Sequence, residues 1–164
     1  PARLALASAL LATLGLSSAP ALAVTTSTSF SVSANSPANC TVSASVLVFG
    51  DIDLVVDTDA VNTVIANCTT GTSYTVALNA GSSGGGIVAD RKMVNTSTGI
   101  DFVDYDLYLD SGRTTIWGET VGVDTVAGTG DGLDQSLTVF ARIPGGQPVV
   151  TGAYSDTITV TLEF

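Results

Sequence analysis

The sequence predicts an all-β fold, an antiparallel β-sandwich, and three observations support this class. Apolar and polar residues alternate along much of the chain, as in "SYTVALNAG" (73–81), where Tyr74, Val76 and Leu78 share one face. Gly, Asn, Asp and Ser interrupt the alternation at short intervals, which is typical of tight turns. No segment beyond residue 23 has a convincing helical stripe. Short strands at this spacing favour a sandwich.

Residues 1–23 have the features of a secretory signal peptide. Arg3 supplies a positive charge, "LALASALLATLGL" is an uncharged apolar run of about thirteen residues, and "ALA" at 21–23 fits the small-x-small cleavage rule. The run is too short for a membrane anchor, which needs about twenty apolar residues. We therefore expect export without membrane insertion, with Val24 as the mature N-terminus.

The segment 24–37, "VTTSTSFSVSANSP", contains small, β-branched and polar residues and no charge. This composition favours extended structure but has too little bulk to form a core of its own. Without further context, a disordered tail or linker is the usual interpretation of such a segment. The alternation runs through Thr26, Thr28, Phe30, Val32 and Ala34.

The first two predicted strands each contain one of the two cysteines. These strands are "CTVSASVLVFG" (40–50) and "VNTVIANCT" (61–69), and each cysteine lies within the tetrapeptide "ANCT". Oxidising compartments form and keep disulfides, so export favours a Cys40–Cys68 bond that joins two strands side by side. A structural zinc site needs four ligands and is disfavoured, since the chain has no histidine. A bridge closing about 28 residues would stabilise the fold by about 3.5 kcal/mol in the chain-entropy model.

Further strands are predicted in the second half of the chain. "DYDLYLD" (104–110) places Tyr105, Leu107 and Leu109 on one face. The last predicted strand has a strongly apolar face, and such a strand at a sheet margin aggregates unless another strand pairs with it. That face consists of Ile158, Val160, Leu162 and Phe164. The other predicted strands are "TTIWGE" (114–119), "SLTVFARIP" (136–144) and "SDTITVTLEF" (155–164).

The charge composition excludes several classes of function. The chain has 164 residues, 15 acidic against 5 basic and no histidine, and its net charge is −10. Such a surface repels nucleic acid and anionic lipid. A single lysine and the missing histidine leave little for acid–base catalysis near neutral pH. We therefore expect neither an enzyme nor a cofactor.

The remaining motifs are weak signals of chemistry. "DID" (51–53) and "DTD" (57–59) could indicate a calcium site or a carboxylate-pair hydrolase, but the EF-hand spacing and its final Glu are absent, which favours solvated loops. "GTGDGLD" (128–134) is one copy of a calcium-repeat-like motif that needs several, which favours a turn. "GSSGGG" (81–86) lacks the Lys of a phosphate loop and indicates a flexible connection. Trp117 could stack on a sugar, but a core position is the commoner role.

Several blocks together resemble a known family. They are the cysteine pair, "DRKM" (90–93), "DYDLYLD", "IWG" (116–118), "VFARIP" and the terminal "GAYSDTITVTLEF". They resemble the spore coat protein U family, which includes subunits of archaic chaperone-usher pili. The resemblance extends from about Asn39 to the end, and the terminal block is its most specific part. Phe140 and Ala141 stand before Arg142, where the family pattern has an aromatic residue and Gly.

The resemblance implies an immunoglobulin-like sandwich that lacks its last strand and is completed by a donor strand from another subunit. It implies three parts: the signal peptide 1–23, a donor extension 24–37 and an incomplete pilin domain 38–164. The donor positions would be Thr26, Thr28, Phe30, Val32 and Ala34. The acceptor groove, where a chaperone also docks, would consist of Val46, Val48, Ile158, Val160, Leu162 and Phe164.

The function implied is that of a structural subunit, a shaft pilin, in an extracellular pilus that serves adhesion and biofilm formation. Head-to-tail donation does not close, so it yields a filament. The implied partners are copies of itself or related pilins, a periplasmic chaperone and an outer-membrane usher. Two alternatives remain open at this stage: a spore-coat or other surface structural protein of the same fold, and a small hydrolase that uses Asp57 and Asp59.

Overall fold

A computed structural model describes residues 22–164, so most of the predicted signal peptide lies outside the described residues. The chain divides into two units. The first unit ends at Asn35, and the second extends from Ser36 to Phe164. Residues 22–39 contain no assigned strand or helix, and their side chains are exposed. Nothing in the described part of the chain forms a helix of the length and hydrophobicity needed to cross a bilayer.

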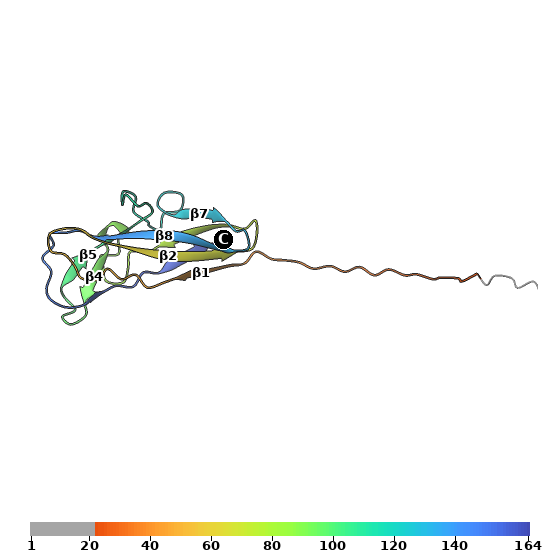
Figure 1. The fold of residues 1–164 in the computed structure, drawn as a ribbon, viewed down its shortest axis with the longest axis horizontal. Coiled ribbons are helices and arrows are strands. Elements are labelled where there is room, and N and C mark those ends of the chain that lie inside the picture. The colour runs from red at the N-terminus through yellow and green to blue at the C-terminus, as the bar shows by residue number, and fades with distance from the viewer. Residues whose placement is uncertain (1–21) are drawn as a thin grey trace, which may run out of the picture. The chain divides into compact units, whose positions relative to one another are not determined.

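The unit from Ser36 to Phe164 is built from antiparallel strands, which confirms the predicted all-β class (Figure 1). Its only helical segment is the short 3-10 turn η1 (Val88–Asp90). The strands are β1 (Cys40–Ala44), β2 (Thr58–Cys68), β3 (Ser73–Leu78), β4 (Lys92–Asn95), β5 (Phe102–Asp104), β6 (Asp106–Tyr108), β7 (Val126–Thr129), β8 (Asp134–Ile143), β9 (Tyr154–Ser155) and β10 (Val160–Glu163).

The strands form three sheets. A four-stranded sheet has the order β1-β2-β8-β6, and a three-stranded sheet has the order β10-β3-β7. A small third sheet, β5-β4-β9, completes the arrangement. The first two sheets present their alternate apolar residues to a shared core, because the side chains of a strand point to opposite faces in turn. Tyr74, Val76 and Leu78 are buried in it, as the alternation predicts.

Trp117 lies in the centre of the core with 1% of its surface exposed, which confirms the core interpretation of this residue. Its indole Nε1 donates a hydrogen bond to the Val76 carbonyl at 3.0 Å. The predicted strand at 114–119 is wrong, because only Ile116 forms a bridge, with Tyr108. The segment instead crosses between the sheets: the Trp117 amide bonds the Leu107 carbonyl, and the Gly118 carbonyl accepts from the Leu78 amide.

The two cysteines lie opposite each other in the β1–β2 ladder and form a disulfide, which confirms the predicted bond. Cys40 pairs with Cys68, and Thr41 pairs with Asn67, so the two "ANCT" tetrapeptides meet side by side in antiparallel strands. The bond fixes one end of the domain, which we call the cystine end.

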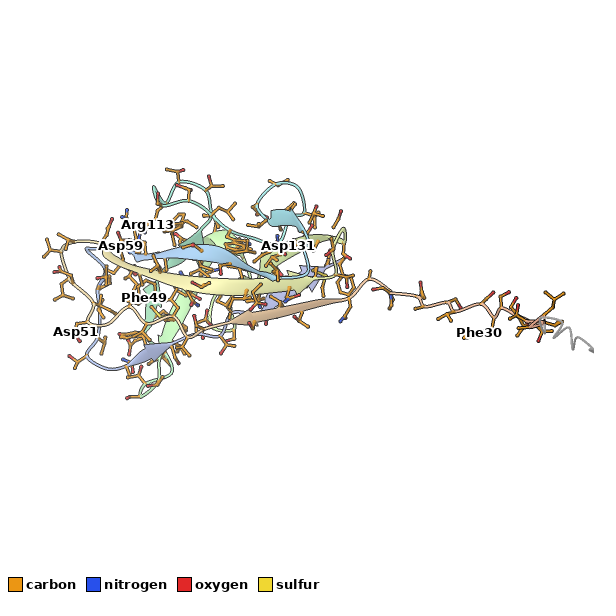
Figure 2. The ribbon with its side chains drawn as sticks, turned by 45° about the vertical axis from the view of Figure 1, so that its right-hand side comes forward. Phe30, Phe49, Asp51, Asp59, Arg113 and Asp131 are labelled. Carbon is orange, nitrogen blue, oxygen red and sulfur yellow. A yellow bond between two sulfur atoms is a disulfide. The ribbon has the colours of Figure 1, made fainter. Side chains whose placement is uncertain are left out.

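The opposite end carries the loops 50–57 and 144–152, and we call it the loop end. The β2–β8 ladder extends from Asn67 paired with Asp134 at the cystine end to Thr58 paired with Ile143 at the loop end. Figure 2 shows Asp131 and Asp51 towards these opposite ends. Nine residue steps separate the two pairs, about 30 Å along the ladder.

Candidate functional site: an open groove between two sheet edges

The candidate site lies where the edge strands of the two main sheets come together. β1 is the edge of one sheet, β10 is the edge of the other, and the two strands contact each other. β10 pairs with β3 along one side, from Val160 opposite Leu78 to Glu163 opposite Thr75. Within residues 22–164, no strand pairs with the other side of β10. Its backbone groups on that side are therefore available to a further strand.

A groove of about 470 Å³ opens where β10 begins, between residues 44–49 and 154–160, and reaches the core. Its floor consists of buried core residues, among them Val64, Leu78, Leu107 and Val139. Its sides consist of Leu47, Phe49, Met93, Tyr105, Tyr154, Ile158 and Val160. The apolar interior of the sandwich is thus accessible along one flank, which makes the groove the candidate binding site of the domain.

In the first strand segment, the inward-facing positions shift from even-numbered to odd-numbered residues, and this change of phase shapes one side of the groove. Cys40 and Val42 are the partly buried positions of β1, but beyond Ala44 the partly buried positions are Leu47 and Phe49. The change occurs at Ser45, whose hydroxyl contacts the Asn62 side chain. The side-chain amide of Asn62 also donates to the Ser45 backbone carbonyl at 2.8 Å. The β1–β2 ladder ends one residue before Ser45, at Ala44.

The change of phase decides which residues of 45–49 reach the groove. Leu47 and Phe49 line it, and the Phe49 ring packs edge-on against the Tyr105 ring with centroids 6.2 Å apart. Val46 also borders the groove, although 85% of its surface is exposed. Val48, 73% exposed, is not among the lining residues. The sequence prediction missed Leu47 and Phe49 because it continued the alternation of β1 without a break.

The four predicted groove positions of the last strand lie in different surroundings. Ile158 and Val160 line the groove, and Leu162 is half-buried against the core beyond it. Phe164 is 62% exposed and lines a separate shallow depression with Ser73, Thr75, Ala127 and Thr129. The structure therefore brings Val46, Ile158 and Val160 together, and it places Phe164 at the cystine end.

One end of the groove is polar and centres on Asp156. Its carboxylate accepts a hydrogen bond from the Tyr105 hydroxyl at 2.7 Å and bonds from the Ser82 amide and hydroxyl, both at 2.8 Å. The Ser83 and Thr157 amides donate to the same carboxylate at 3.0 and 2.8 Å. Burial alone raises the pKa of Asp156, but these hydrogen bonds outweigh it and hold the pKa below its usual value. Burial also raises the pKa of Tyr105, and its bond to Asp156 adds to the effect.

The acidic pair considered as a hydrolase is engaged in ion pairs. Arg142 contacts both carboxylate oxygens of Asp59, at 2.7 and 2.9 Å, and its Nη1 lies 2.9 Å from Asp57. The hydrogen bond from Arg142 holds the pKa of Asp59 below its usual value, although burial opposes it. A carboxyl that stays ionised and paired in this way is a poor general acid.

The acidic and glycine-rich loop motifs have structural roles. Asp53 Oδ1 accepts from the Val55 and Val56 amides at 2.7 and 3.0 Å. Asp131 accepts from the Leu133 amide at 2.9 Å, so "GTGDGLD" forms the predicted turn between β7 and β8. "GSSGGG" is a connection anchored by Asp156 through its two serines.

The N-terminal extension is an uncharged strand candidate in which a few apolar side chains stand among Ser and Thr. Phe30, labelled in Figure 2, exposes 87% of its surface, and Val32 exposes 84%. Thr26, Thr28 and Ala34, the other positions of the same alternation, are exposed as well. Such a segment has alternate side chains available for a partner surface.

An antiparallel sandwich with a cystine between its first two strands and a groove along an open edge defines a class of incomplete β-sandwich. The family model for the Spore Coat Protein U domain matches residues 26–161, and the chain belongs to this family. Protein U of Myxococcus xanthus is 27% identical over 159 residues, which cover 88% of each protein.

The fold also has a counterpart among solved structures. One chain in the crystal structure of the CsuC-CsuE chaperone-tip adhesion subunit pre-assembly complex, from archaic chaperone-usher Csu pili of Acinetobacter baumannii, matches with a TM-score of 0.59 and 24% identity. The match covers 77% of the present chain and 40% of the chain in that complex. The protein therefore spans less than half of the length of that solved chain. At this identity the likeness establishes the fold.

Proposed function

We propose that the protein is a structural subunit of an extracellular pilus, built by donor-strand complementation and serving in the shaft. The observation that carries the proposal is the groove beside the free edge of β10, which opens the core to an incoming strand. An exposed sheet edge beside an apolar groove aggregates unless a strand covers it. The membership of the family and the fold it shares with a pilus subunit complex support the same function.

The donor in this proposal is the N-terminal extension of another copy or of a related pilin. Thr26 to Ala34 spans nine residues, about 30 Å when extended, and the segment from Asp156 in the groove to Phe164 at the cystine end also has nine residues. Phe30 and Val32 would bury their exposed side chains in the groove, each gaining about 1.5–3 kcal/mol. Backbone hydrogen bonds to β10 would complete the sheet.

The direction of the chain favours a second copy over self-insertion. The extension joins the domain at Cys40, at the cystine end, and β10 also ends at the cystine end. An extension that folded back into its own groove would run parallel to β10. The extension of a second copy can run antiparallel to β10, and antiparallel pairs are slightly more stable per residue. Donation between copies then leads to a head-to-tail filament.

The proposal extends to processing and assembly. Cleavage after Ala23 would release a chain that begins at Val24, with the extension 24–37 followed by the domain 38–164. A periplasmic chaperone would cover the groove until the extension of another subunit replaces it, and an outer-membrane usher would export the polymer to the cell surface. Adhesion and biofilm formation are the roles proposed for the assembled pilus. Intact mass of the secreted protein tests the cleavage site: a mass that includes the apolar run 4–16 would contradict it.

The experiment that tests the function is electron microscopy of material secreted by cells that also express a periplasmic chaperone and an outer-membrane usher of the chaperone-usher class. The unaltered chain should give long filaments, whereas deletion of residues 25–34 should abolish them and leave the disulfide intact. The double variant Phe30→Asp, Val32→Asp keeps the length of the extension and should fail as well, because insertion would desolvate two charges. Filaments of normal length from the deletion variant would show that the extension is only a tail.

A second experiment tests chaperone capture by the last strand. Leu162→Asp places a charge on the half-buried face of β10 and should abolish recovery of the chaperone complex. Thr161→Ser, on the exposed face of the same strand, is the matched control and should have no effect. An unchanged yield of complex with Leu162→Asp would place the docking surface elsewhere.

A coat or other surface structural protein of the same fold is the second candidate, and the family's description favours it. The two candidates differ in their need for assembly factors. Surface display that persists without a chaperone and an usher would favour the coat protein.

A further inference from the structure

The loop end of the domain carries an exposed apolar ridge within an acidic segment. Leu54, Val55 and Val56 expose 62%, 82% and 60% of their surfaces, and "DID" and "DTD" flank them. We call these three residues the apolar ridge. Three consecutive exposed apolar residues mark an interaction surface rather than an ordinary solvated loop.

Hydrogen bonds hold the ridge in one conformation with its side chains outward. Besides the bonds from Val55 and Val56 to Asp53, the Gly146 amide donates to the Leu54 carbonyl at 3.0 Å. Gly145 packs so closely that a Cβ atom there would lie 2.5 Å from the Val55 carbonyl oxygen. The ridge is therefore pre-organised, which reduces the entropy lost when a partner binds.

The direction of the donor strand identifies what covers the ridge, and this step rests on the proposed function. An extension that runs antiparallel to β10 enters the groove at the loop end, so Ala34 of the donor copy lies at the loop end of the acceptor. Five residues, 35–39, then connect Ala34 to Cys40 of the donor domain. Fully extended, the six residue steps from Ala34 to Cys40 reach at most about 21 Å, and Pro37 restricts them further. The cystine end of the donor is thus held beside the ridge of the acceptor.

The cystine end has matching apolar surface. Leu133 and Phe164 expose 68% and 62% of their surfaces there. Leu133 lies in the turn whose Gly132 amide bonds the Cys68 carbonyl, and Phe164 borders the shallow depression beside β3. Each end of the domain therefore has exposed apolar residues that the head-to-tail arrangement brings together.

We propose that the apolar ridge of one copy packs against the cystine end of the copy that donates its strand, at the surface around Leu133 and Phe164. This contact adds to the inserted strand and fixes the angle between consecutive domains. Without it, the five-residue connection is a hinge. With it, the filament is a stiff array of domains.

Cross-linking within assembled filaments tests the contact. In the double variant Val55→Cys, Leu133→Cys the native cysteines remain bonded to each other, so a short bismaleimide reacts only with the new thiols. The proposal expects a ladder of dimers, trimers and longer species on a denaturing gel. The control is Val123→Cys, Leu133→Cys, which should give no ladder; Val123 lies between β6 and β7 and is 75% exposed, similar to Val55.

The outcomes separate this inference from the proposed function. Absence of filaments from the unaltered chain would overturn both. Filaments of Val55→Cys, Leu133→Cys without a ladder would overturn the contact alone, and equal ladders from both variants would mean that the cross-links join neighbouring filaments, which also overturns it.

A charge on the ridge provides a second measurement. Val55→Asp, Val56→Asp leaves the groove and the extension unchanged, so filaments should assemble but bend more, with a severalfold shorter persistence length in electron micrographs. Filaments of unchanged stiffness that lose attachment to an apolar surface would overturn the contact and assign the ridge to adhesion.

Discussion

Replacement of Asp156 by Asn tests how the polar end of the groove is held. The carboxylate accepts from five donors on Tyr105, Ser82, Ser83 and Thr157, at 2.7–3.0 Å. Asn keeps one acceptor oxygen but loses the charge. Hydrogen bonds to a charged group contribute about 1.5–3 kcal/mol each and neutral ones about 0.5–1.5 kcal/mol, without full additivity. We expect the free energy of unfolding at pH 7 to fall by about 2 kcal/mol.

The stability difference between wild type and Asp156→Asn should depend on pH. Because the pKa of Asp156 is lower in the folded protein than in the unfolded chain, its ionised form stabilises the fold above the unfolded pKa of about 3.9. That contribution is lost as the pH falls through the folded value. The difference between wild type and Asp156→Asn should therefore be complete between pH 7 and pH 5 and should shrink below about pH 4.

Urea unfolding followed by the fluorescence of Trp117, the single tryptophan, measures both effects. The matched control is Asp51→Asn, because the Asp51 carboxylate is exposed and accepts no hydrogen bond from the described residues. A difference between wild type and Asp156→Asn that stays constant from pH 7 to pH 3, or grows at low pH, would refute the reasoning.

Two further predictions concern the stability of the domain. Replacement of both Cys40 and Cys68 by Ala should lower the free energy of unfolding by about 3.5 kcal/mol, since the bond closes a separation of 28 residues; an unchanged urea midpoint would contradict this. Trp117→Phe should cost about 2 kcal/mol, because it leaves the buried Val76 carbonyl without its indole donor and opens a cavity. Near-UV circular dichroism should show that the fold persists, and a loss under 0.5 kcal/mol would mean that this hydrogen bond contributes little.

The features of the fold that depend on local pattern could be predicted from the sequence. Tyr74, Val76 and Leu78 alternate between polar neighbours, and all three are buried. Export with two cysteines predicted one disulfide, and the structure contains it. These predictions succeed because side chains alternate strictly along a strand and because one pair of thiols allows one pairing.

The features that depend on contacts between distant segments could not be predicted. The phase change at Ser45 depends on Asn62, seventeen residues away, so the alternation in 40–50 gave no sign that Leu47 and Phe49 would line the groove. β4 (KMVN) and β7 (VAGT) are four residues long, and in neither sequence do apolar and polar residues alternate clearly. Gly128 in β7 is needed because the Tyr74 ring fills the space of its side chain, a contact that the sequence alone does not reveal.

The central claim is that the groove accepts the N-terminal extension of another copy, and a peptide of residues 24–37 tests it most directly. The recipient is the full chain carrying Phe30→Asp and Val32→Asp, whose own extension cannot insert. A peptide at a thousandfold excess over its dissociation constant stabilises its target by about 4 kcal/mol. For a domain of this size we expect the melting temperature to rise by about 10 °C or more, with a lower hydrogen-exchange rate along β10. The same peptide with both Asp substitutions should have no effect, and equal melting temperatures with and without the native peptide would contradict the account.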